Sequence, residues 1–163
     1  MTAQAANRMA NYELIRKNQG VDAAEAYLGH ERSKSGRKTD FYITLNGNVV
    51  PATGYRYMDS QRAKDALTKG EQYTTYIGFT KYDSASQVKD AFQIADAWSD
   101  CKVRGEFDTL QVIDKMYVPT EKGNTTTIPE PITCSYPEYG KGGEQQLCVD
   151  TVVKFKNVTI IGD

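Results

Sequence analysis

The chain has 163 residues, of which 39% are hydrophobic and 25% are charged, and its net charge is −1. This length predicts a single domain, 1–163, with room for a buried core. The balanced charge predicts no overall basic field for nucleic acid. We find no apolar run that predicts a membrane span and no apolar core of a signal peptide at the N-terminus, so we expect a soluble chain, either cytosolic or cut from a larger protein.

Histidine and cysteine are scarce. The chain has a single histidine, His30, so it offers few ligands for zinc and little support for a Ser-His-Asp hydrolase. We therefore predict no metal site. Three cysteines without metal-type spacing argue against a full disulfide framework, although one pair, such as Cys134 with Cys148, stays open.

The N-terminal segment, 1–38, is expected to be helical. Apolar residues recur at helical spacing over 3–17, and a second short helix is predicted over 21–29. The polar and basic stretch 30–38 predicts a loop, either solvated or in contact with a phosphate.

Strands dominate from residue 41 onward. A strand over 41–45 and the Asn46-Gly47 pair predict a two-residue hairpin. A short strand follows over 54–59, and then a helix that begins at Asp59 or Ser60 and ends before Gly70.

The second half of the chain also alternates between predicted strands and a predicted helix. A strand is predicted over 73–80, and Ser84 begins a helix that runs to about Trp98, with Phe92 and Trp98 in the core. The expected remainder is a loop over 99–106, a strand over 107–118, a loop over 121–131, and two final strands over 146–155 and 157–161. This order of helices and strands predicts an α+β fold.

Arg56 lies between two tyrosines on a predicted strand. Because side chains alternate along a strand, Arg56 should point away from Tyr55 and Tyr57. A guanidinium in that position suits a phosphate or carboxylate, and a surface salt bridge explains it equally well.

Glycines cluster before the penultimate strand. Gly140, Gly142 and Gly143 predict a backbone that bends tightly or lies against a ligand, and an ordinary turn is the alternative. Glu144, Gln145 and Gln146 follow directly and can aim carboxylate and amide groups at whatever the glycines approach.

The order of three segments resembles the ADP-ribosyltransferase superfamily, especially the C-terminal toxin domains of bacterial polymorphic (Rhs-type) effectors. These segments are Tyr55-Arg56-Tyr57, the stretch from Tyr76 to Ser84, and the Gly142–Gln146 strand start. Residues 82–86 and 98–111 are also similar to those effector domains. The resemblance implies a split, mostly antiparallel two-sheet core over 41–163 that binds NAD between the sheets.

The resemblance also implies site residues. Arg56 matches the arginine that holds the dinucleotide, and Thr80 is nearest to the Ser/Thr motif, although Gly78-Phe79-Thr80 replaces the usual Ser-Thr-Ser. Glu144 would act on the nicotinamide ribose, with Gln146 as the alternate catalytic residue. Tyrosines that could stack on NAD are Tyr55, Tyr57, Tyr76 and Tyr82.

The implied function is an ADP-ribosyltransferase toxin that uses NAD as substrate and needs no metal. Its implied partners are a cognate immunity protein and a macromolecular acceptor, either protein or RNA. It would be a monomeric secreted effector domain that acts in the cytoplasm of a target cell, without a membrane partner.

Three other functions stay open. The Gly-Gly-x-x-Gln pattern is similar to NAD glycohydrolase toxins of the same fold. A ribonuclease would use His30 with the basic residues of its loop, namely Arg32, Lys34 and Arg37. A binding module without catalysis would use the tyrosines against a protein partner.

Overall fold

A computed structural model describes residues 12–18, 20, 21, 24, 41–43 and 49–163. The chain forms two compact units, Met1–Thr53 and Gly54–Asp163. In the first unit residues 12–18 are helical, in agreement with the helix predicted over 3–17. The basic loop 30–38, which contains His30, and most of the helix predicted over 21–29 lie outside the described residues.

The hairpin prediction is half right. Strands β1 (Phe41–Ile43) and β2 (Val49–Pro51) are antiparallel, and Ile43 lies opposite Val49. A two-residue turn at 46–47 would place Ile43 opposite Val50 instead. The predicted register is therefore wrong by one residue, and the turn itself lies outside the described part of the chain.

The second unit contains two sheets, of three and two strands, in the orders β3-β5-β7 and β4-β6. The fold is α+β, as predicted, and the pairs β5–β7 and β4–β6 are antiparallel. The strands are β3 (Thr53–Met58), β4 (Glu71–Ile77), β5 (Val103–Asp108), β6 (Leu147–Lys154) and β7 (Asn157–Ile160).

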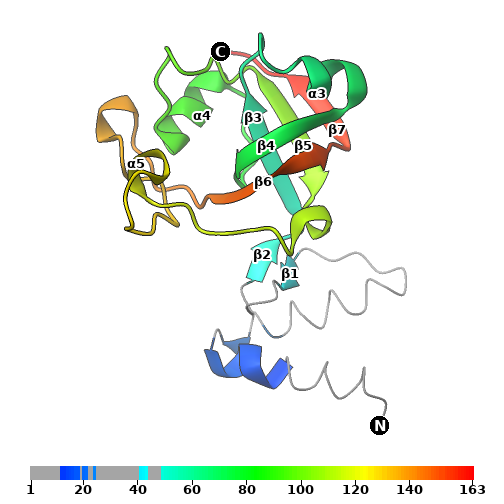
Figure 1. The fold of residues 1–163 in the computed structure, drawn as a ribbon, viewed down its shortest axis with the longest axis vertical. Helices are drawn as coiled ribbons and strands as arrows, with labels where there is room; N and C mark the ends of the chain where they lie inside the picture. The colour runs from blue at the N-terminus through cyan, green and yellow to red at the C-terminus, as the bar shows by residue number, and fades with distance from the viewer. Residues whose placement is uncertain (1–11, 19, 22–23, 25–40, 44–48) are drawn as a thin grey trace. The chain divides into compact units, whose positions relative to one another are not determined.

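The two sheets are joined where β3 meets the end of β4. The Tyr55 N–H donates to the Gly78 carbonyl at 2.9 Å, and the Gly78 N–H donates back to Tyr55 at 3.0 Å. Strands of the two sheets run at a steep angle to one another in Figure 1. The two sheets therefore meet at Tyr55 and Gly78.

Two helices connect the strands. Helix α3 (Lys64–Lys69) ends at Gly70, which has a φ of 70° and donates its N–H to Ala66, as the sequence predicts. Helix α4 (Ala85–Phe92) begins after Ser84, whose side chain accepts from the Gln87 N–H. The helix predicted to reach Trp98 stops at Phe92, because Gln93 adopts a left-handed φ of 56°.

Strand β5 begins earlier and ends earlier than the predicted strand over 107–118. The Asp108 side chain accepts from the Leu110 N–H at 3.0 Å and starts a 3-10 helix, η1 (Thr109–Val112). The predicted loop over 99–106 contains the first four of the six residues of the strand, because Gly105 leaves room for the Phe155 ring against the backbone. Charged neighbours of Gly105 hide this strand from a pattern based on hydrophobicity.

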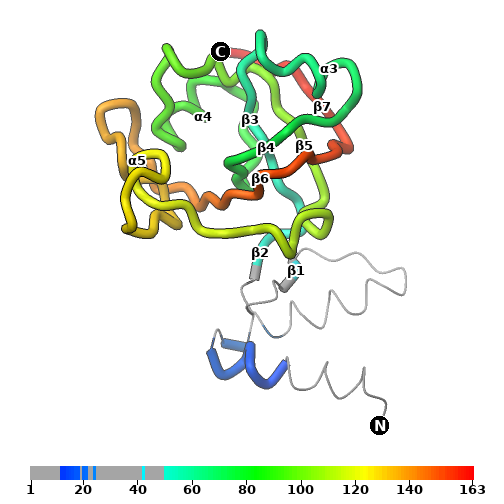
Figure 2. Tube along the Cα trace, in the orientation of Figure 1, coloured from blue at the N-terminus to red at the C-terminus, as the bar shows by residue number. Residues whose placement is uncertain are grey.

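A long connection leads from β5 to β6 and carries short helical turns, α5 (Glu121–Asn124) and η2 (Pro137–Tyr139). Figure 2 shows this chain leaving β5, forming a lobe and returning into β6. Cys101, Cys134 and Cys148 are free thiols, so Cys134 and Cys148 do not pair.

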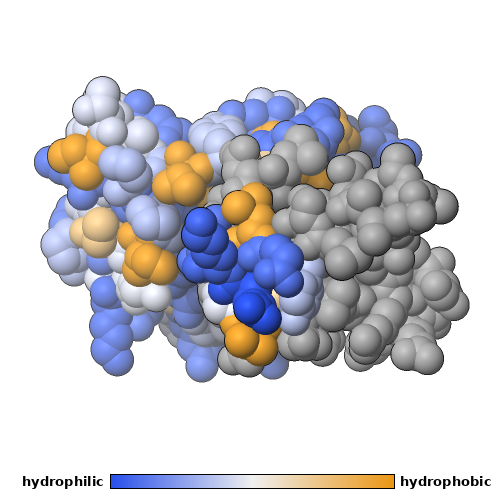
Figure 3. Space-filling model, turned by 90° about the horizontal axis from the view of Figure 1, so that it is seen from below, coloured by the Kyte–Doolittle hydropathy of each residue, from blue (hydrophilic) through white to orange (hydrophobic). Residues whose placement is uncertain are grey.

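The core of the second unit has two clusters of buried side chains. One joins Met58 and Val103 beneath α3, and the other joins Val88, Cys101 and Ile161 beneath α4. Apolar side chains on the face drawn in Figure 3 are separated by polar ones. Among the described residues, no helix is long and apolar enough to cross a membrane.

Candidate functional site

A cavity of about 640 Å³ lies where the two sheets diverge. We call it the Arg56 cavity. Residues of β3, β4, α4 and the long connection line it, and five of the predicted site residues are among them: Tyr55, Arg56, Tyr57, Tyr76 and Gln146. The remaining predicted residues, Thr80, Tyr82 and Glu144, form a cluster next to it.

Arg56 is half-buried, and its charge has no counterion among the described residues. Its Nη1 donates to the Tyr76 carbonyl at 2.8 Å, but its Nε is buried without a hydrogen-bond partner. None of the ion pairs between described residues includes Arg56. Burial lowers the pKa of Arg56, yet an arginine stays protonated in proteins. The salt bridge that the sequence left open is therefore not formed within the described residues.

Gln146 reaches the same cavity from the start of β6. Its Nε2 donates to Glu130 Oε1 at 3.1 Å, and both side chains are buried, with exposures of 7% and 6%. Glu130 also lines the cavity. Glu130 is not among the residues that the sequence predicts for the site, although its place between Pro129 and Pro131 signals a rigid backbone.

Glu144 is held by two hydroxyl donors. Thr80 Oγ1 donates to Glu144 Oε2 at 3.0 Å, and the Tyr82 hydroxyl donates to Oε1. No ion pair between described residues includes Glu144. Its negative charge is thus oriented by neutral donors and is not neutralised by a cation.

Tyr57 connects this cluster with the Arg56 cavity. Its hydroxyl donates to the Thr80 carbonyl at 2.8 Å and accepts from the Tyr82 N–H at 2.7 Å. Its ring lines the cavity and lies 6.3 Å from the Tyr82 ring. Strand β3 and residues 80–82, which are distant in sequence, therefore meet at Tyr57.

We expect these tyrosines to make stability fall at high pH. Burial raises the pKa of Tyr57 to about 12, and burial together with the Glu144 hydrogen bond raises the pKa of Tyr82. The folded state holds these protons above pH 10, where the unfolded state loses them, so the contribution of these two tyrosines to the free energy of unfolding should be constant below about pH 10 and fall above it.

Urea unfolding of the wild type and of Tyr57→Phe between pH 8 and 11 checks this dependence. The variant should lose less stability than the wild type over the upper part of that range. Parallel curves for the two proteins would contradict the expectation.

The glycines before β6 pack against the protein itself. A Cβ at Gly142 would lie 2.3 Å from the Thr133 carbonyl oxygen, and one at Gly140 would lie 2.4 Å from the Asp90 carbonyl oxygen. Thr133 in turn donates from its Oγ1 to the Ala91 carbonyl and accepts from the Glu144 N–H. The glycines therefore fix Glu144 against the end of α4, and the tight bend, not contact with a ligand, explains them.

Gly142→Ala should destabilise the protein by about 2 kcal/mol or more beyond the cost of a left-handed backbone, because its methyl group would clash with Thr133. Gly143→Ala is the matched control, since Gly143 has a φ of 89° and open space around it. Chemical denaturation of both variants measures the difference. Equal destabilisation would show that packing at Gly142 is unimportant.

Gly78 departs from the Ser-Thr-Ser pattern for a steric reason. A Cβ at this position would lie 2.5 Å from the ring of Phe92. Phe92 closes the wall of the Arg56 cavity and contacts the rings of Tyr57 and Tyr82. A serine at position 78 would displace this ring.

Aromatic side chains also lie at the rim of the cavity. Trp98 is 44% exposed, so its predicted place in the core is wrong. Its ring contacts Tyr136 and Tyr139 edge-on, with both centroid distances 5.0 Å. Trp98 and Tyr136 line the Arg56 cavity and offer stacking surfaces that the sequence analysis did not identify.

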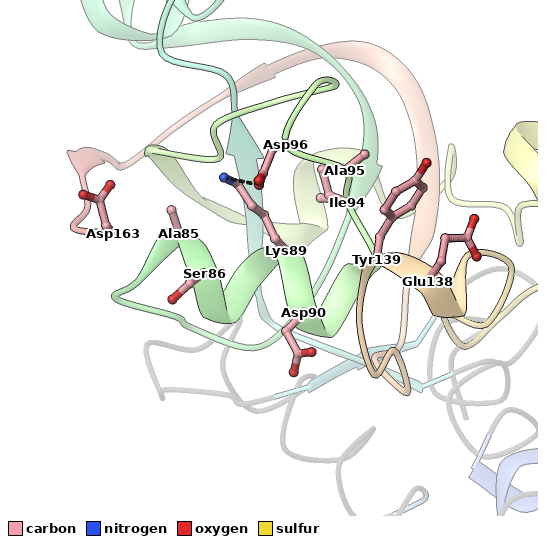
Figure 4. A pocket seen from close by; sticks show the side chains of 10 residues that line it. All are labelled: Ala85, Ser86, Lys89, Asp90, Ile94, Ala95, Asp96, Glu138, Tyr139 and Asp163. Atoms are coloured by element: carbon pink, nitrogen blue, oxygen red, sulfur yellow. Dashed lines mark hydrogen bonds and ion pairs between the residues drawn. The ribbon is translucent and has the colours of Figure 1, made fainter.

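A second hollow of about 530 Å³ lies beside α4. Figure 4 shows the ion pair of Lys89 with Asp96 within it, with Tyr139 and Glu138 on one side and Asp163 on the other. None of the predicted site residues lines this hollow.

Within the described ranges, no group of three or more histidine, cysteine or acidic residues could hold a metal ion. No family model, curated protein or solved structure matches this chain. The chemistry of the Arg56 cavity and of the Glu144 cluster is therefore the basis for the proposed function.

Proposed function

We propose that this protein is an NAD-consuming enzyme of the ADP-ribosyltransferase type. The observation that carries the proposal is Arg56, a half-buried cation with a buried, unpaired Nε and no counterion among the described residues, in a cavity lined by tyrosines. A charge that is partly removed from water without a partner is costly, and an anionic ligand removes that cost. A guanidinium is suited to the diphosphate of a dinucleotide.

The size and lining of the cavity support a nucleotide. Its volume lies in the usual range for small-molecule sites, roughly 300–1,000 Å³. Tyr55, Tyr57 and Tyr76 line the interior, and Trp98 and Tyr136 lie at the rim. Aromatic walls of this kind stack on adenine and nicotinamide.

Glu144 supplies the charge that the reaction needs. The bond between nicotinamide and ribose breaks, its electron pair leaves with nicotinamide, and positive charge develops on the ribose. A carboxylate oriented by Thr80 and Tyr82 stabilises that charge until the acceptor's nucleophile bonds to the same carbon.

One observation favours a second candidate, NAD glycohydrolase. Gln146, and not Glu144, lines the Arg56 cavity. In that enzyme the amide oxygen of Gln146 would stabilise the ribose and water would be the acceptor.

The resemblance in sequence also suggests the biological role of the protein. It would make this chain a toxin domain of an Rhs-type effector that acts in the cytoplasm of a competing cell. It would transfer ADP-ribose to a protein or RNA, act as a monomer, and be neutralised by an immunity protein. The two-sheet arrangement around Arg56 is compatible with the ADP-ribosyltransferase fold.

The fate of labelled ADP-ribose distinguishes the two candidates. The purified chain is incubated with NAD labelled in its ADP-ribose half, in buffer and in cell lysate. Label on a macromolecule that protease or nuclease digestion removes supports transfer. Free ADP-ribose in buffer supports hydrolysis, and unchanged NAD in both conditions contradicts the proposal.

A further inference from the structure

We infer that Glu130 is a positioning residue that directs the carbonyl oxygen of Gln146 into the Arg56 cavity, toward a ribose. This inference rests on the proposed function and, within it, on the candidate in which the amide oxygen of Gln146 stabilises the ribose. It concerns a residue outside the motifs that suggested that function.

The orientation of the Gln146 amide follows from its partners. Its nitrogen lies 3.1 Å from the Glu130 carboxylate and 3.5 Å from the Glu130 backbone carbonyl. Both partners are acceptors, so the NH₂ group must face them and the carbonyl oxygen, Oε1, must face the other way.

The freed carbonyl oxygen is open to the cavity. No described residue donates to Gln146 Oε1, and Arg56 Nε is the one buried polar side-chain atom without a partner in the described part of the chain. Solvent therefore reaches Oε1, and Gln146 lines the Arg56 cavity. The cavity thus presents a cation from Arg56 and a neutral acceptor from Gln146.

Glu130 is itself held firmly. Its carboxylate accepts from the Cys134 N–H at 3.1 Å and from the Ser135 hydroxyl, and its own N–H donates to the Pro119 carbonyl at 2.7 Å. A fixed carboxylate prevents the Gln146 amide from turning over. Its charge also polarises the amide and increases the negative character of Oε1.

The Arg56 guanidinium and the Gln146 carbonyl oxygen together define which part of a nucleotide the Arg56 cavity recognises. An acceptor beside a cation suits a ribose that donates from its hydroxyl groups and is attached to a phosphate. The same oxygen stabilises positive charge that develops on that ribose during loss of nicotinamide. Glu130 acts only through Gln146, so its effect should appear mainly in kcat.

The test compares Glu130→Gln with Glu138→Gln, in the 163-residue chain with NAD as substrate. Glu130→Gln preserves volume but lets the Gln146 amide turn over, so kcat should fall about 10- to 100-fold while KM changes by less than about threefold. Glu138→Gln makes the same change at an exposed carboxylate on η2 outside the Arg56 cavity, so its kcat should stay within about twofold of wild type.

A measurement on the wild type tests the inference even if a variant does not fold. The Gln146 side-chain NH₂ resonances, assigned by ¹⁵N NMR, should show slow proton exchange. Rapid exchange of these protons would overturn the inference, as would equal kcat values for the two variants. If the wild type releases no nicotinamide while its Gln146 protons exchange slowly, the proposed function fails and the inference fails with it, although the amide orientation is correct.

Discussion

Arg56→Met should abolish NAD turnover without destabilising the protein. We expect kcat/KM to fall at least about 100-fold, because the cation that binds the diphosphate is removed. The free energy of unfolding should change by less than about 1 kcal/mol, because removal of a half-buried charge without a counterion among the described residues offsets loss of the hydrogen bond to the Tyr76 carbonyl. Enzyme kinetics and urea unfolding measure the two effects.

Arg104→Met is the matched control. Arg104 is more deeply buried than Arg56, and it forms an ion pair with Asp83 at 2.6 Å and donates to the Tyr82 carbonyl at 2.7 Å. Its replacement should destabilise the protein by about 1–2 kcal/mol. If Arg56→Met is as destabilising as Arg104→Met, Arg56 is a structural residue and not a ligand-binding one.

Glu144→Gln should reduce kcat about 100- to 1,000-fold with little loss of stability. Glutamine has nearly the same size and keeps an oxygen that accepts from Tyr82 or Thr80, but it lacks the charge that stabilises the ribose cation. Single-turnover kinetics with NAD and thermal unfolding check the two parts of this expectation.

Glu138→Gln serves as the control, because Glu138 is an exposed carboxylate on η2 outside the Arg56 cavity. Equal activity of the two variants would remove Glu144 from the mechanism. Catalysis would then be assigned to Gln146, which supports the glycohydrolase.

Local signals predicted several elements well. Gly70 ends α3 and Ser84 begins α4, because both positions depend on backbone groups within one turn of the helix. The α+β class and strands β4, β6 and β7 also follow from local patterns. The end of α4 at Gln93 does not, since its left-handed conformation is tied to tertiary bonds from its side chain to Gly140 and Tyr136.

The site shows the same division. The resemblance in sequence predicts Arg56, Thr80, Glu144 and Gln146 as site residues, but only the tertiary structure reveals that Glu144 bonds to Thr80 while Gln146 bonds to Glu130. Contacts between residues far apart in sequence have no local signature. The sequence predicts a tight bend or a ligand contact at the glycines, but their packing against α4 is a tertiary feature without a sequence signal.

Release of nicotinamide from NAD by the purified chain tests the central claim most directly, because transfer and hydrolysis share this step. The assay is run in buffer and in lysate, with the wild type beside Arg56→Met. We expect the wild type to release nicotinamide in at least one condition and the folded variant to release none above background. No release by folded wild-type protein in either condition, or equal release by both proteins, would contradict the assignment of the Arg56 cavity as an NAD site.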